Sequence, residues 1–121
     1  MKYESLSVRT FVGSRDYDES RDFYRKMEFT ELELGSQISY FKINESHGFY
    51  LQKYYVKDWV ENSMIFVELS NLDEVHQSIA KKRLQDQYDH VKLSEIKSLD
   101  WGREFFLHDP SGVLWHFGEF N

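Results

Sequence analysis

The sequence predicts an α+β fold in which two tandem βαβββ modules form a cup-shaped mixed sheet, within a single domain over residues 1–121. The chain has 121 residues, of which 40% are hydrophobic, and this suits one ordinary domain with a sizeable core. Short stretches of alternating apolar residues, typical of strands, surround two helical patterns. The order of these elements repeats, which places module 1 at about 5–56 and module 2 at about 63–120.

Module 1 opens with the alternating stretch from Ser7 to Gly13, which predicts its first strand. Asp16, followed three residues later by Glu19, is a pattern that begins a helix, because the first acid can cap the helix N-terminus. Turn residues then separate three further stretches of β type, near 29–34, 37–44 and 49–56.

Module 2 repeats this order. An apolar stretch at 64–69 predicts its first strand, and Asn71 with Glu74 repeats the helix-opening pattern. Val75 and Ile79 lie four residues apart, so they share one face of the second helix. Further strands are predicted near 91–97, 103–108 and 113–119.

The two modules can be aligned residue on residue. Phe11 falls on Phe66 in the first strands, and Gln52 falls on His116 in the last strands. Chance similarity between amphipathic segments would also produce a few such matches, but the shared order of elements argues for a true repeat.

Charge and composition exclude several classes of partner. The net charge of -6 and the pI near 5.3 repel polyanions, so we expect no nucleic-acid partner and no anionic-membrane partner. The chain has no cysteine, so neither a disulfide nor a thiolate site is available. No apolar run has the length of a signal-peptide core or of a membrane span, and we therefore expect a cytoplasmic protein.

Two motifs carry a family resemblance. The first runs from Asp16 through Ser20 to Phe23-Tyr24, and the second is the segment 108–117, HDPSGVLWHF. With the duplication, they make nearly the whole chain similar to the glyoxalase/bleomycin-resistance/dioxygenase (vicinal oxygen chelate) superfamily. The segment 101–105, WGREF, most resembles the bleomycin-resistance binding proteins. The resemblance implies a role in antibiotic resistance and a homodimer whose cups are each completed by the partner chain.

Metal-dependent members of this superfamily place ligands on the first and last strands of each module. The resemblance puts these positions at Arg9, Gln52, Met64 and His116. A guanidinium cannot ligate, a thioether suits hard divalent ions poorly, and an amide oxygen is a weak ligand. Only His116 remains, whereas a catalytic zinc site normally needs about three protein ligands. We therefore expect no metal, no catalytic residues and no cofactor.

Strand alternation divides the side chains between two faces of the sheet. An aliphatic set is expected under the helices: Val8, Thr10, Val12, Ile65, Val67 and Leu69. The opposite face mixes aromatic and polar groups, as a ligand pocket does. Together with Trp101, whose counterpart in the resembled proteins lies beside the drug groove, it supplies the predicted ligand-binding residues: Arg9, Tyr50, Gln52, Tyr54, Met64, Phe66, Glu68, Trp101 and His116. Two structural alternatives stay open, an Arg9–Glu68 ion pair inside a filled cup and Trp101 as a loop anchor.

These observations favour a binding protein over an enzyme. We expect a homodimer that sequesters a cationic or planar aromatic small molecule, such as a bleomycin-type glycopeptide. The alternative is a glyoxalase/dioxygenase-superfamily lyase or isomerase with an atypical metal site, or with metal-free acid–base chemistry at His116 and Glu68. A third possibility is a self-filled cup that acts through a protein partner.

Overall fold

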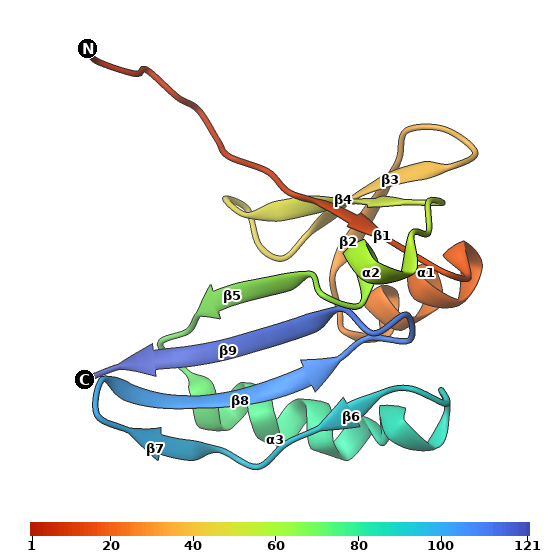
Figure 1. The fold of residues 1–121 in the computed structure, drawn as a ribbon. Helices are drawn as coiled ribbons and strands as arrows, with labels where there is room; N and C mark the ends of the chain where they lie inside the picture. Colours follow the sequence, from red (N-terminus) through yellow and green to blue (C-terminus); the bar gives the residue numbers. More distant parts are fainter.

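The computed structural model describes residues 1–121 and shows an α+β fold with two β-sheets (Figure 1). The first half contains β1 (Phe11–Gly13), α1 (Tyr17–Lys26), β2 (Thr30–Glu33), β3 (Ile38–Lys42) and β4 (Gly48–Gln52). The short helix α2 (Lys57–Val60) connects the halves. The second half contains β5 (Met64–Glu68), α3 (Leu72–Lys82), the 3-10 turn η1 (Leu84–Asp86), β6 (Lys92–Leu93), β7 (Lys97–Leu99), β8 (Gly102–His108) and β9 (Leu114–Phe120). None of the helices has the length and apolar character that crossing a bilayer requires.

The two sheets have the same topology. Sheet A has the order β1-β4-β3-β2, and sheet B has the order β5-β9-β8-β6, with β7 also paired to β8. In each sheet the first strand runs parallel to the last strand, and the other pairs are antiparallel. The α+β prediction with mixed sheets is therefore confirmed. The first strand of each sheet, β1 or β5, is an edge strand.

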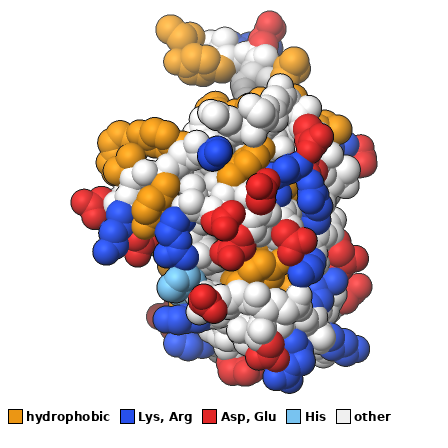
Figure 2. Space-filling model, turned by 90° about the vertical axis from the view of Figure 1, so that its right-hand side faces the viewer, with side chains coloured by type: hydrophobic (Ala, Val, Ile, Leu, Met, Phe, Trp, Pro, Cys, Tyr) orange, Lys and Arg blue, Asp and Glu red, His pale blue; other side chains and the backbone are white.

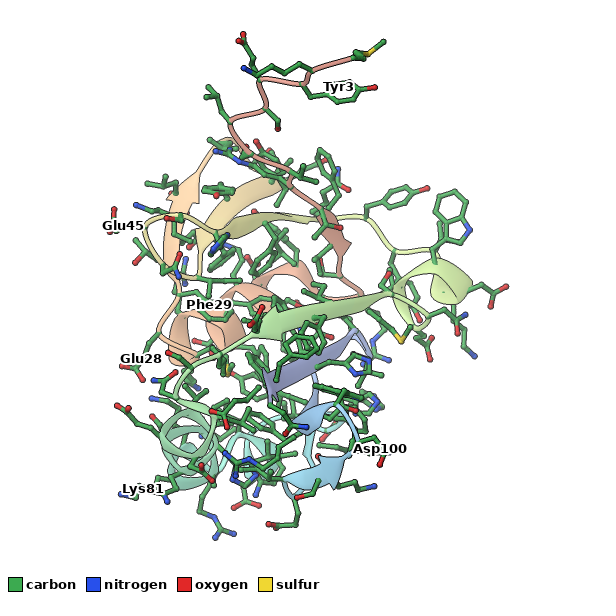
Figure 3. The ribbon with its side chains drawn as sticks, turned by 90° about the vertical axis from the view of Figure 1, so that its left-hand side faces the viewer. Tyr3, Glu28, Phe29, Glu45, Lys81 and Asp100 are labelled. Atoms are coloured by element: carbon green, nitrogen blue, oxygen red, sulfur yellow. The ribbon has the colours of Figure 1, made fainter.

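One aromatic core joins the two halves. Tyr24 of α1 contacts Phe49 of sheet A and Trp115 of sheet B, and Phe29 packs against all three rings. The Tyr24 hydroxyl donates to the buried carboxylate of Asp109 at 2.5 Å and accepts from Trp115 Nε1 at 3.0 Å. Figure 3 shows Phe29 between the halves. Because both sheets turn their inner faces to this core, their other faces point outward.

The first strand is shorter than the predicted Ser7–Gly13 stretch. Residues 1–8 lie outside the folded body as an extended arm, and Figure 3 shows Tyr3 well clear of it. Arg9 and Thr10 still reach sheet A, where the Tyr50 backbone N–H donates to the Thr10 carbonyl at 3.0 Å. Val8 is 95% exposed and Thr10 is exposed, so the expectation that they pack under the helices is wrong for this chain, whereas Val12 is buried as expected. The physical reason is that both side chains border an open groove and no helix packs over them.

Two other elements differ from the predictions. The stretch near 91–97 is two short strands, β6 and β7, because the segment between them bends at Ser94, whose backbone N–H and side chain bind Phe106. The strand expected at 49–56 ends at Gln52, and α2 follows where no helix was predicted. The aliphatic residues expected on the inner face of β5, Ile65 and Val67, do pack against the core.

Pairing of the strands also corrects the alignment of the repeat. Phe11 pairs with Tyr50 in sheet A, and Phe66 pairs with His116 in sheet B. If Phe11 corresponds to Phe66, the counterpart of His116 is therefore Tyr50 and not Gln52. The predicted alignment was thus shifted by two residues. Because side chains in a strand alternate between its two faces with a period of two, this shift left the predicted face of these residues unchanged.

Candidate functional site

Sheet B presents an outward surface that we call face B. Residues directly opposite each other in paired strands point to the same side of the sheet. Two rows of such residues, running across β5, β9 and β8, define face B: Met64–Leu114–His108 and Phe66–His116–Phe106. A third row adds Glu68, Gly118 and Glu104. Met64 and Phe66 are exposed, whereas His116, Phe106 and Glu104 are half-buried. Face B thus combines aromatic rings with carboxylates.

Three aromatic rings gather at one end of face B. The Phe66 ring centroid lies 6.1 Å from that of Trp101 and 5.9 Å from that of Phe120, and the last two are 5.1 Å apart. Gly118 lies beneath them, because a Cβ there would come within 2.5 Å of the Phe66 ring and 3.3 Å of the Trp101 ring. The missing side chain lets both rings approach the strand backbone.

The turn that carries Trp101 is tied to residue 121. The Asn121 backbone N–H donates to the Trp101 carbonyl at 3.0 Å, and the Asn121 side-chain amide donates to the Asp100 carbonyl at 2.9 Å. Trp101 is half-buried and packs only against the aromatic rings named above, so it both anchors the turn and offers part of its surface to solvent. The two interpretations of Trp101 are therefore compatible.

His116 lies at the centre of face B. Its Nδ1 is 3.6 Å from the Glu104 carboxylate, and its ring meets Phe106 edge-on with centroids 4.8 Å apart. Glu68 is exposed at the edge strand β5 and forms no ion pair with His116. The carboxylate that accompanies His116 is thus Glu104, which the sequence analysis did not select.

Sheet A presents a second outward surface, face A. Phe11 stacks on Tyr50 with centroids 4.9 Å apart, and Tyr40 follows at 5.3 Å from Tyr50. The Arg9 guanidinium lies over Tyr40, 4.3 Å from the ring centroid, and donates to the Tyr50 hydroxyl at 2.9 Å. Arg9 is held by tyrosines, so the ion pair with Glu68 considered from the sequence does not form within the chain.

Gln52 and Tyr54 are less closely associated with either face. Gln52 is half-buried and pairs with Ile38 in sheet A. Tyr54 follows the end of β4, and its exposed ring lies 6.4 Å from that of Trp59 on α2. Tyr54 therefore belongs with Trp59 beside α2 and not with the residues of face A around Tyr50.

A groove of about 980 Å³ runs along the edge strand β5. Residues 65–70 of β5 and the segment after it line this groove together with the end of β9, and Val8, Thr10 and the β3–β4 turn line it as well. Of the nine predicted ligand residues, only Phe66 and Glu68 line this groove.

Seven of the nine predicted residues thus form two groups on two outward faces: Arg9 and Tyr50 on face A, and Met64, Phe66, Glu68, Trp101 and His116 on face B. The two groups do not meet in one cup within a single chain. Strand alternation could have identified Tyr40 and Phe106, which face outward, but only the first and last strands of each module had been assigned. No three His, Cys, Asp or Glu side chains gather as a metal site would require. The absence of a metal stays a prediction.

Comparison with known proteins gives matches at the level of structure alone. A scan against protein-family models finds no match, and a search of curated proteins finds none either. The bleomycin-binding protein from bleomycin-producing Streptomyces verticillus, solved with copper(II)-bleomycin, matches with TM-score 0.82 at 15% identity, over 99% of this chain and 100% of that one. TnmS3, an antibiotic binding protein from Streptomyces sp. CB03234, matches with TM-score 0.72 at 16% identity, over 99% and 100% of the two chains.

A fosfomycin resistance protein shares the same architecture. FosX from Listeria monocytogenes, solved with Mn(II) and sulfate, matches with TM-score 0.71 at 14% identity, over 99% of this chain and 93% of that one. At these identities the similarity establishes the fold. The chain has the fold seen in bleomycin-binding and other antibiotic-binding proteins.

Proposed function

We propose that this protein binds and sequesters a small molecule, a planar aromatic compound with a cationic group, and does not chemically change it. The observation that carries the proposal is face B, where exposed aromatic rings lie next to carboxylates on a sheet with the fold of antibiotic-binding proteins. Aromatic rings stack on planar groups, and carboxylates attract cations. Sequestration needs no nucleophile and no metal.

We further propose that the binding cup forms between two chains. Faces A and B point outward because their inner faces share one core, so neither can cover the other within the chain. In a homodimer, face A of one chain would cover face B of the partner and bury a ligand between them. Exposed rings on both faces and unpaired edges at β1 and β5 support this arrangement.

A calorimetric titration with metal-free bleomycin tests the binding proposal. We expect the Trp101→Ala variant to bind about 1–3 kcal/mol more weakly than the wild type, because one stacking surface is lost. Trp59→Ala is the matched control, since Trp59 is an exposed ring outside face B. Thermal melts of both variants separate a binding effect from unfolding. Equal affinity of wild type and Trp101→Ala would place the ligand elsewhere, and no wild-type binding would remove bleomycin as the ligand.

A further inference from the structure

The charges on face B are unevenly distributed. Glu68 and Glu104 lie in the row of Gly118, near the Trp101 end, and the exposed Lys97 pairs with Glu104 at the border of this row, which leaves two carboxylates against one cation. Lys92 lies at the other end of face B. It pairs with His108 between β6 and β8, and so belongs to the row of Met64, Leu114 and His108. The two end rows are separated by the row of His116. Face B therefore has an acidic end and a basic end, although the chain as a whole is acidic.

The basic end opens into a pocket of about 510 Å³. Lys92, His90, His108 and Arg15 line it, and the buried Ser111 lies beside them. Figure 2 faces this end of the molecule and shows a histidine among Lys and Arg side chains at its left-hand edge.

Arg15 is held in place by the loop that precedes β9. Its backbone N–H donates to the Ser111 hydroxyl at 2.9 Å, and its guanidinium donates to the Pro110 carbonyl at 3.3 Å. Neither Arg15 nor Lys92 forms an ion pair with a carboxylate, whereas Arg21, Arg25 and Arg103 all do. The guanidinium is thus positioned beside the pocket with its charge uncompensated.

One carboxylate, Glu61, lines the pocket against the two cations Arg15 and Lys92. It accepts a hydrogen bond from the Tyr55 hydroxyl at 2.7 Å and forms no ion pair with either cation. The environment of His108 agrees with an excess of positive charge, because burial and then the charge of Lys92 lower the pKa of His108. The charged and titratable groups that face His108 in the pocket are Lys92, His90, Arg15 and Glu61.

We infer that this basic pocket is an oxyanion subsite, which binds a phosphate, sulfate or carboxylate group of a small molecule through Arg15, Lys92 and His108. The inference deepens the proposed function and rests on it for the rest of the ligand: a molecule lying on face B would place its cationic group at Glu68 and Glu104, its planar part on the aromatic rings, and its anionic group in the pocket. The ligand class is accordingly zwitterionic and not simply cationic.

The test uses inorganic phosphate as the probe on the full chain. NMR signals of the histidine rings are followed during a phosphate titration, with sodium chloride holding the ionic strength constant. We expect a saturable change at His108 and a raised pKa of its ring, because a bound anion stabilises the protonated imidazole. His76 is the internal control, since its ring binds the Ser94 carbonyl at 2.8 Å behind sheet B and should not respond.

A double variant and a matched control decide the outcome. Arg15→Gln with Lys92→Gln should weaken phosphate binding at least tenfold, and a thermal melt checks that it is folded. Lys97→Gln, which removes an exposed charge beside Glu104 at the acidic end, should leave binding within about twofold. Sulfate and acetate titrations then show whether a tetrahedral anion or a carboxylate fits better.

Two results would overturn the inference. One is a response to phosphate that does not saturate, or that chloride alone reproduces. The other is equal phosphate affinity of the double variant and the wild type, which means an adventitious ion only. Because the probe is inorganic phosphate, failure of bleomycin to bind would remove the proposed drug and leave this subsite standing.

Discussion

Tyr24 links the two halves of the chain through a network of buried hydrogen bonds. Its hydroxyl accepts from Trp115 of sheet B and donates to Asp109, which also accepts from the backbone N–H groups of Ser111 and Val113. All side chains in this network are buried. A buried polar group that loses its partner costs more free energy than a hydrogen bond contributes, so the network is sensitive to any single deletion.

Replacing Tyr24 by Phe should lower the free energy of unfolding by about 2–4 kcal/mol, because it leaves Oδ2 of Asp109 and the indole N–H of Trp115 without their partner. Tyr17→Phe is the matched control: the Tyr17 hydroxyl contacts Ser39, but Ser39 keeps a second bond to Glu31. Urea unfolding of the two variants gives the comparison. A Tyr17→Phe loss as large as that of Tyr24→Phe would contradict the role of the network.

Asp109 also predicts a dependence of stability on pH. Burial raises the pKa of its carboxyl to about 6 from the ordinary value of 3.8, against the effect of its hydrogen bonds. Between pH 3.8 and about pH 6 the Asp109 carboxyl is protonated more often in the folded chain than in the unfolded chain. Its contribution to stability therefore falls as pH rises through this range and levels off above it. We expect the stability difference between wild type and Asp109→Asn to fall by roughly 1 kcal/mol per pH unit between pH 4 and pH 6. Chemical unfolding across that range measures it, and a flat difference would refute it.

At the scale of elements, β9 carries both the core and the site, with Trp115 and Phe117 facing inward and His116 and Gly118 facing outward. Such alternation is visible in the sequence, which is why the inner residues of β5, Ile65 and Val67, were predicted correctly. The register between strands is not visible, because a shift of one full alternation period preserves every inward and outward assignment. This explains how His116 was aligned with Gln52 in place of Tyr50.

Gly118→Ala should disturb the site more than the fold. The added Cβ meets the end of the Phe66 side chain, which can move, so we expect a stability change of about 1 kcal/mol or less. Displacement of Phe66 and Trp101 should weaken ligand binding and alter the near-UV circular dichroism of the tryptophans. Gly35→Ala is the control, because a Cβ there meets only a distant methyl group of Ile38. Unchanged spectra and affinity in Gly118→Ala would show that the Phe66 and Trp101 rings do not depend on this glycine.

For the whole molecule, the sequence predicted the α+β class and the repeat, because both follow from the local order of strands and helices. It did not predict how the two halves pack. Arg9 and Glu68 were predicted to line one cup, with an ion pair between them as an alternative. Their faces instead point outward from a shared core, and only the three-dimensional packing of Tyr24 and Trp115 determines this. The basic pocket was missed for a similar reason, since Arg15 and Lys92 are far apart in sequence.

The proposed dimer gives a prediction at this scale. Light scattering at tens of micromolar should give twice the chain mass of 14.7 kDa. Phe11→Glu should shift the population to monomer, because it puts a charge on face A where the partner would pack. Leu34→Glu is a control of equal exposure, 58% for both side chains, on the turn between β2 and β3. A monomeric wild type, or equal effects of the two substitutions, would rule out the arrangement.

The bonds of Asn121 to the Trp101 turn have a consequence for how variants should be screened. Asn121 lies outside every strand and helix, yet its backbone N–H and its side-chain amide both bind this turn. Asn121→Ala removes the bond to the Asp100 carbonyl and would loosen Trp101 with no change inside any strand or helix. Such a variant would lose ligand affinity while its melting temperature stayed constant, so a screen by thermal stability alone would miss it.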